Sequence, residues 1–152
     1  PATTYRYVTL NTEWALPDGR KPFADKRVRQ AFNYAFDSEA YAKVVFNGYA
    51  KEPTSIFSDS IRFYAEQTPY KPDLEKAKAL MKEAGFEDGF DVELIVDNTT
   101  IEQKGAVFVQ QQLSQINVNV KVLPNESTAN AEKTSAPLED VVCKLGFRFL
   151  RG

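Results

Sequence analysis

The sequence predicts an α/β (α+β) domain in which helices pack on a mixed sheet, and three segments carry this prediction. Residues 91–96 alternate apolar and acidic side chains, as a strand with one buried face does. Residues 118–122 repeat the alternation, and residues 101–116 between them place apolar side chains along one side of a helix. A helix between two such strands forms a βαβ unit, which favours parallel neighbours and a right-handed crossover.

The segments before this unit predict one strand and two helices. Residues 4–11 are rich in β-branched and aromatic side chains and alternate as a strand does, before a run of turn residues. Residues 25–36 predict an amphipathic helix that Asp25 caps. Asp37 or Ser38 can cap a second helix, which Asn47 and Gly48 end. The apolar side of this second helix is predicted to contain Tyr41, Val44 and Val45.

A long irregular connection, residues 49–72, follows the second helix. Its loop aromatics can line a pocket, although filling gaps between packed elements is the commoner use. These aromatics are Phe57, Phe63, Tyr64 and Tyr70. Residues 73–85 predict a charged, solvent-facing helix that Asp73 caps and Gly85 ends. Beyond Pro124 the pattern weakens, and residues 140–149 predict a final strand.

The composition is that of one ordinary globular domain. The 152 residues have a net charge of −2, and 43% of them are hydrophobic. A chain of this length buries about 68–70% of its unfolded surface, which suffices for a core without disulfides. The net charge predicts no nucleic-acid partner, because such a partner usually calls for a basic stripe. No apolar run is long enough for a membrane span, and the start PATTYRY lacks the features of a signal peptide.

The residue types present predict no enzyme. The chain has no histidine and one cysteine, Cys143, which excludes histidine-based triads and zinc clusters. The glycine-containing segments match neither phosphate-binding motif. Asp91 and Glu93 share one strand face, which is more often solvated than catalytic, and Ser114 and Ser135 have no base partner. We therefore expect no catalytic residue, no cofactor and no metal.

Five segments occur in a specific order and spacing. They are LNTE (10–13), PFADKRVRQAFNYAFD (22–37), NGYAKEPTS (47–55), YKPDLEKAKALMKEAGFEDGFDVEL (70–94) and VQQQLSQINVNVKV (109–122). Together they resemble the peptide/nickel-binding family of ABC-transporter extracytoplasmic solute-binding proteins. The resemblance runs from residue 5 to residue 126, and residues 127–152 form a weakly matching tail.

The resemblance implies that residues 1–152 are a single partial domain, part of the second, C-terminal lobe of a two-lobe periplasmic-binding-protein-like fold. Complete members of the family close two lobes over a peptide or related small solute and deliver it to the membrane subunits of an ABC permease. The implied location is extracytoplasmic, either the periplasm or a lipoprotein at the cell surface. The alternative is a standalone, non-catalytic α/β interaction domain with no transport role. A peptide, a nickel chelate and an oligosaccharide all remain open as the ligand.

The candidate ligand-binding residues are Asp97, Asn98 and Thr99. Their loop leaves the carboxyl end of a predicted parallel strand, the edge where α/β sheets usually bind ligands. Asn98 or Thr99 could instead cap the following helix. Members of the family resembled sometimes have an Arg here that meets a peptide carboxylate. This chain has none, which leaves a neutral ligand end or a different solute class open.

Two arginines on one predicted helix have two possible roles. Arg27 and Arg29 lie on the helix predicted over residues 25–36 and could bind an anionic ligand. Because ion pairs and carbonyl contacts are the common use of arginine, we expect them to anchor neighbouring carboxylates or carbonyls.

Overall fold

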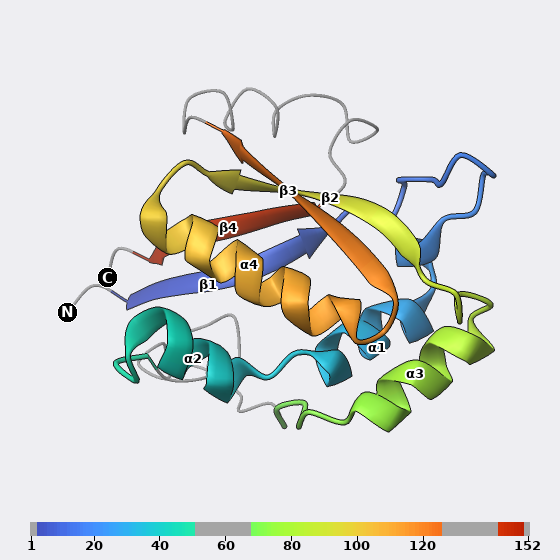
Figure 1. Cartoon of the computed structure of the whole chain (residues 1–152), viewed down its shortest axis with the longest axis horizontal. Coiled ribbons are helices and arrows are strands. Elements are labelled where there is room, and N and C mark those ends of the chain that lie inside the picture. Colours follow the sequence, from blue (N-terminus) through green and yellow to red (C-terminus); the bar gives the residue numbers. More distant parts are fainter. Residues whose placement is uncertain (1–2, 51–67, 126–142, 151–152) are drawn as a thin grey trace.

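The computed structural model describes residues 3–50, 68–125 and 143–150 (Figure 1). Its elements, in chain order, are β1 (Thr3–Leu10), the 3₁₀ helix η1 (Pro22–Ala24), α1 (Lys26–Ala35), α2 (Ser38–Phe46), α3 (Leu74–Glu83), β2 (Phe90–Asp97), α4 (Thr100–Ser114), β3 (Val118–Asn125) and β4 (Cys143–Leu150). Each helix and strand predicted on these residues is present. Residues 51–67, with Phe57, Phe63 and Tyr64, lie outside the described residues, as do residues 126–142.

The four strands form one mixed sheet in the order β1-β4-β2-β3. β2 and β3 are parallel in a register that pairs Phe90 with Val118 and Asp97 with Asn125, which confirms the predicted βαβ pairing. β4 is parallel to β2 and antiparallel to β1. The last strand of the chain therefore separates the first strand from the second (Figure 1). This insertion was not predicted.

The core lies between the helices and one face of the sheet. Val92, Leu94 and Val96 are 3%, 1% and 0% exposed, as the alternation predicts. They share one cluster with buried side chains of α1, α3, α4 and β3. On the opposite face the exposed Asp91 carboxylate accepts a hydrogen bond from Asn119 at 3.0 Å, and Glu93 pairs with Lys121 at 3.4 Å. The helices thus cover the face that carries the valines and the leucine of β2.

Side-chain caps begin all four α-helices. Asp25, Asp37 and Asp73 accept hydrogen bonds from backbone N–H groups at 2.8, 2.8 and 3.0 Å, as predicted. At the end of α3, Gly85 has a φ of +79°, and the Phe86 N–H donates back to the Met81 carbonyl at 2.8 Å. These local hydrogen bonds explain why the helix ends follow the sequence closely.

The apolar side of α2 is narrower than predicted. Val45 is buried, but Val44 is 47% exposed, so its predicted place on the packed side is wrong. Ala42 and Val45 are buried and Tyr41 is half-buried, so the packed side of this nine-residue helix does not extend to Val44. In the part of the chain that the structure describes, no helix is long and apolar enough to cross a membrane.

Candidate functional site

The predicted ligand loop lies at the carboxyl edge of the parallel strands. Asp97 is the last residue of β2 and is half-buried opposite Asn125, the last residue of β3. Asn98 and Thr99 are exposed and lead directly into α4. The register therefore brings the ends of both parallel strands to one edge of the sheet, where α/β folds usually bind ligands.

One of the three residues has a clear structural role. The Thr99 hydroxyl accepts a hydrogen bond from the Glu102 N–H at 3.4 Å and so caps α4, which confirms the capping interpretation for this residue. Asn98 does not cap the helix. Its Oδ1 accepts a hydrogen bond from the Gln103 side chain at 2.6 Å. The Thr99 N–H donates to the Asp97 carbonyl at 2.8 Å, which folds the loop tightly over the end of the strand.

The chemistry of this edge is that of hydrogen-bond acceptors. The loop carries a carboxylate, an amide and two hydroxyls, and residues 97–100 include no cationic side chain. Such a set suits the N–H groups of a peptide or an ammonium group better than a carboxylate. Ile101 adds an exposed apolar side chain next to the loop. The described residues include no group of three carboxylates and thiols placed to hold a metal ion.

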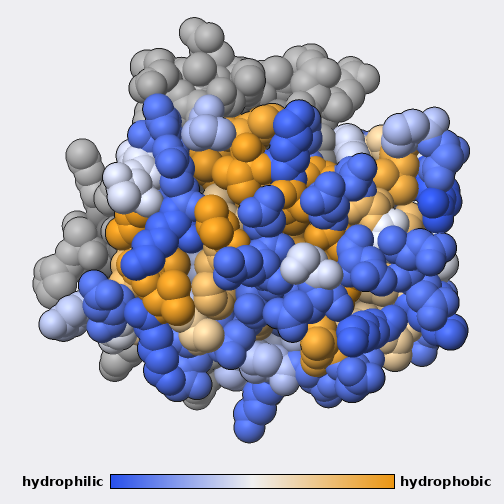
Figure 2. Space-filling model, in the orientation of Figure 1, coloured by the Kyte–Doolittle hydropathy of each residue, from blue (hydrophilic) through white to orange (hydrophobic). Residues whose placement is uncertain are grey.

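The surface around α4 mixes polar and apolar side chains. Figure 2 shows hydrophobic surface gathered in the upper left of this face, whereas the right-hand part is mostly hydrophilic. Exposed apolar side chains on α4 include Ile101 and Val107. The polar loop therefore has apolar neighbours that can contact the side chains of a solute.

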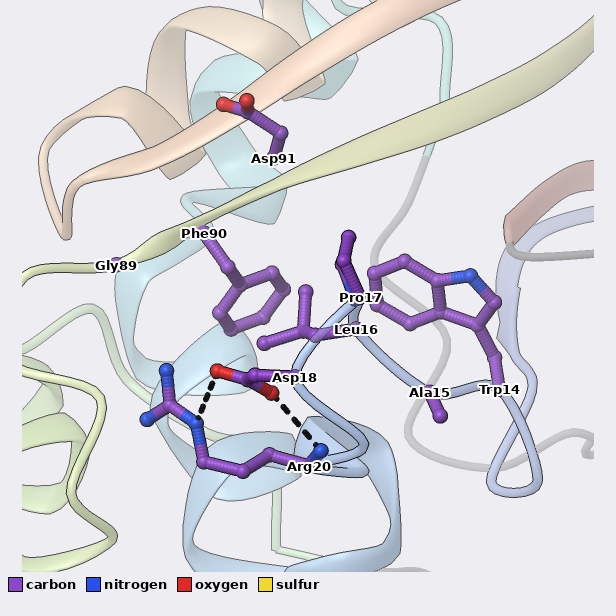
Figure 3. A pocket seen from close by; sticks show the side chains of 9 residues that line it. All are labelled: Trp14, Ala15, Leu16, Pro17, Asp18, Arg20, Gly89, Phe90 and Asp91. Atoms are coloured by element: carbon purple, nitrogen blue, oxygen red, sulfur yellow. Dashed lines mark hydrogen bonds and ion pairs between the residues drawn. The ribbon is translucent and has the colours of Figure 1, made fainter.

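A shallow hollow lies at the opposite end of β2 (Figure 3). Its walls come from the turn after β1 and from the start of β2, and its lining residues are Trp14, Ala15, Leu16, Pro17, Asp18, Arg20, Gly89, Phe90 and Asp91. Asp18 pairs with Arg20 at 2.8 Å, and the Arg20 backbone and side-chain N–H groups hold the pKa of Asp18 below its usual value. Arg20 also donates to the Gly85 carbonyl at 3.1 Å. These hydrogen bonds hold the walls of the hollow together.

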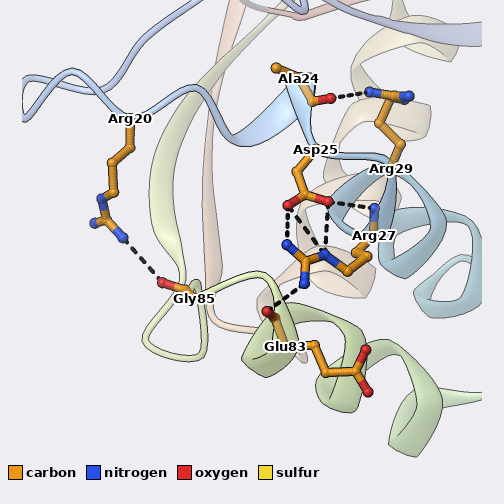
Figure 4. A network of polar contacts seen from close by, with 7 residues as sticks. All are labelled: Arg20, Ala24, Asp25, Arg27, Arg29, Glu83 and Gly85. Atoms are coloured by element: carbon orange, nitrogen blue, oxygen red, sulfur yellow. Dashed lines mark hydrogen bonds and ion pairs between the residues drawn. The ribbon is translucent and has the colours of Figure 1, made fainter.

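The two arginines on α1 anchor structure and do not line an open site (Figure 4). Arg27 binds the Asp25 carboxylate at 2.7 Å and donates to the Glu83 carbonyl at 2.8 Å, which ties α1 to α3. Its hydrogen bonds lower the pKa of Asp25, and the same contact raises the pKa of Arg27. Arg29 donates to the carbonyls of Phe23 and Ala24 at 2.6 and 2.9 Å. The predicted anchoring role is confirmed for both.

Sequence reasoning missed two residues near the loop. Glu102 is fully buried in the first turn of α4, although its charge suggested an exposed position. The spacing Thr99-x-x-Glu102 is that of a capping box, a signal that points to the start of α4 but not to burial. Gly105 lies one turn further along and contacts α2, and a glycine inside a helix is the only sequence signal for that contact.

The family model of bacterial extracellular solute-binding proteins, family 5 (middle), matches residues 1–140. The chain belongs to this family. The resemblance stated from the five segments is therefore confirmed, and the family's extracellular character confirms the expected extracytoplasmic location.

Similar proteins and solved structures agree with this assignment. The chain is 38% identical to the glutathione-binding protein GsiB of Salmonella typhimurium over 123 residues, which are 80% of this chain and 23% of GsiB. The periplasmic binding protein DppA of Helicobacter pylori, solved with the peptide STSA, has a TM-score of 0.85 and 30% identity, over 97% of this chain and 27% of DppA.

A dipeptide-binding protein of Pseudoalteromonas, solved with Met-Leu, has a TM-score of 0.84 and 27% identity, over 96% of this chain and 28% of that protein. The predicted α/β class within a two-lobe periplasmic-binding-protein fold is thereby confirmed. The chain spans about a quarter of the length of these proteins.

Proposed function

We propose that this chain is part of the solute-binding component of an ABC importer. In this proposal the complete component captures peptides or related small solutes outside the cytoplasm and delivers them to the membrane subunits of a permease. The chain forms part of the second, C-terminal lobe and has no catalytic role. The observation that carries the proposal is the family 5 match over residues 1–140, joined to the structural likeness to a peptide-bound DppA.

The proposed ligand contacts are Asp97 and Asn98, with Thr99 shaping the loop. Glutathione, STSA and Met-Leu, which the relatives bind, are all peptides or peptide-like solutes. Their N–H groups are donors, and the loop offers carboxylate and amide acceptors at an exposed edge. Thr99 caps α4 and so fixes the direction in which Asn98 leaves the strand.

The loop supplies one wall of a binding site. Sites for small ligands bury about 70–90% of the ligand surface, and an exposed edge cannot do so without a second wall. If half of a binding free energy of about −8 kcal/mol is lost with that wall, the remaining −4 kcal/mol corresponds to roughly millimolar affinity. We therefore expect the 152-residue chain alone to bind peptides weakly.

Calorimetry tests the proposal on the longest natural protein that contains this sequence. The probes are glutathione, Met-Leu and the tetrapeptide STSA. Asp97→Ala should raise the Kd about tenfold or more, because a hydrogen bond to a charged group contributes about 1.5–3 kcal/mol. Asn98→Ala should weaken binding less, and the thermal unfolding midpoint of both variants should stay close to wild type.

Asp91→Asn is the matched control, because Asp91 is an exposed carboxylate at the other end of the same strand. Unchanged affinity in Asp97→Ala and Asn98→Ala would reject these residues as the site. A wild-type protein that binds none of the probes would reject the peptide ligand itself.

A further inference from the structure

A tight contact between α2 and α4 lies directly behind the candidate ligand loop. The Tyr41 hydroxyl is shielded from solvent and lies where Gly105 has no side chain. A Cβ added at Gly105 would be 2.6 Å from the Tyr41 hydroxyl oxygen and 3.4 Å from the ring carbon that bears it. Only glycine at position 105 lets α4 approach the tyrosine this closely.

The tyrosine has little room to move away. Its ring packs against Phe36, Phe46 and Phe108, with centroid distances of 5.4, 6.0 and 5.5 Å. Rings packed at these distances resist a swing that would let the hydroxyl retreat. A side chain at position 105 would therefore strain this contact and force α4 to shift relative to Tyr41.

A second contact fixes the other end of the same seam. The Asp37 N–H, at the start of α2, donates to the Gln112 side-chain oxygen at 3.2 Å. The contacts 37 with 112 and 41 with 105 show that α2 and α4 run in opposite directions (Figure 1). α2 therefore contacts α4 at two points along the length of the helix.

The first turn of α4 connects the contact between α2 and α4 to the ligand loop. Gly105 lies three residues after Glu102, on the same side of the helix, and both are buried. The Glu102 N–H is bonded to Thr99, and the Gln103 side chain is bonded to Asn98. A shift of α4 would therefore carry Asn98 and Thr99 with it.

We propose that Tyr41 is a positioning residue for the ligand loop, because its contact with Gly105 sets the position of α4 and thereby the place of Asn98 and Thr99. The inference rests on the proposed solute-binding function. Tyr41 itself lies behind the loop and acts on the solute only through α4.

The test combines three variants in the longest natural protein that contains this sequence. Gly105→Ala should raise the Kd for the bound peptide about tenfold, since a displacement of about 1 Å in a site can cost even more. Tyr41→Phe should raise it less. The double variant should recover most of the loss, because the Phe ring leaves ordinary contact distances of 3.4 and 3.5 Å to the new Cβ. Val107→Ala, an exposed position on the same helix, is the control.

Two readouts separate positioning from plain packing. Affinities are measured at a temperature where every variant is fully folded, and the amide chemical shifts of Asn98 and Thr99 are recorded without solute. Shifts that move in Gly105→Ala and return in the double variant support the inference. Wild-type affinity and unchanged loop shifts in Gly105→Ala overturn it, as does a double variant that recovers neither. If Gly105→Ala does not fold, the same two measurements are made on Tyr41→Phe. A raised Kd with moved loop shifts then supports the inference, and wild-type values of both overturn it.

Different measurements reject the inference and the proposed function. A wild-type protein that binds no peptide rejects the function, whereas the solute-free amide shifts still decide whether Tyr41 places the loop.

Discussion

The two ends of β2 differ in the polar groups that they carry. At the amino end, Arg20 and Arg27 donate to backbone carbonyls, and Arg20 also pairs with Asp18 beside a hollow with aromatic walls. At the carboxyl end, Asn98 and Thr99 are exposed on a short loop without cationic side chains, and they bond to the Gln103 side chain and the Glu102 N–H. The comparison teaches that a hollow can arise where packed rings and ion pairs leave a gap, whereas the proposed ligand contacts rest on the usual place of ligands at the carboxyl ends of parallel strands.

The largest expected effect is on the aromatic cluster at the amino end. Phe23 is fully buried, and its ring lies 5.4–5.7 Å from the rings of Trp14, Phe32 and Phe90. Phe23→Ala should lower the free energy of unfolding by about 3–5 kcal/mol, as measured by urea denaturation. Val44→Ala, at an exposed position, should change it by less than about 0.5 kcal/mol. Equal effects of the two would show that the cluster is not the core of this end.

The next effect tests the turn that leads into β2. Gly89 has a φ of +73°, and an added Cβ would overlap the backbone carbonyl of Asn117. Gly89→Ala should destabilise by about 1–3 kcal/mol from the overlap alone, in addition to the strain of the left-handed backbone. Gly85→Ala is the matched control, because Gly85 has a φ of +79° and open space around it. If both variants lose the same stability, the close approach to Asn117 contributes nothing.

At the carboxyl end the expected stability effects are smaller and fall on one residue. Thr99→Ala removes the cap of α4 and should cost about 1 kcal/mol, whereas Thr99→Ser keeps the hydroxyl and should cost much less. Asn98→Ala should leave the thermal unfolding midpoint nearly unchanged. A large loss of stability in Asn98→Ala would show that Asn98 has a structural role. The contrast with the amino end would then disappear.

The smallest effect depends on pH. Arg27 holds the pKa of Asp25 below its usual value, so the pair stabilises the fold above the unfolded pKa of about 3.9. This contribution should disappear as the pH falls through the still lower folded pKa. Asp25→Asn keeps an N-cap side chain but loses the charge, so it should cost about 1 kcal/mol or less at pH 7, and the cost should shrink toward pH 2.

Urea denaturation of wild type and Asp25→Asn at both pH values measures this difference. Glu75→Gln is the control, because the Glu75 side chain is largely exposed beside Lys78. A cost of Asp25→Asn that does not depend on pH would contradict the charge pair between Asp25 and Arg27.

Sequence reasoning succeeded where the deciding interactions are local. Asp25, Asp37 and Asp73 were predicted as caps because a cap bonds to a backbone group two or three residues away. The candidate loop was located in the same way, from the end of one strand pattern and the start of one helix pattern. Val44 was misplaced because the apolar stripe of a short helix does not say how much of it a partner covers.

The sequence alone therefore determined the helices, the strands, the parallel βαβ pair and the position of Asp97, Asn98 and Thr99 at a strand end. Periodicity and capping carry this information over a few residues. The tertiary structure alone decided that β4 enters the sheet between β1 and β2, that Glu102 is buried and that Tyr41 meets Gly105. These features join segments far apart in the chain, such as Thr3 and Leu150, which are partners in neighbouring strands and lie 147 positions apart. No local pattern specifies which distant surfaces will meet, because packing selects them from many compatible pairings.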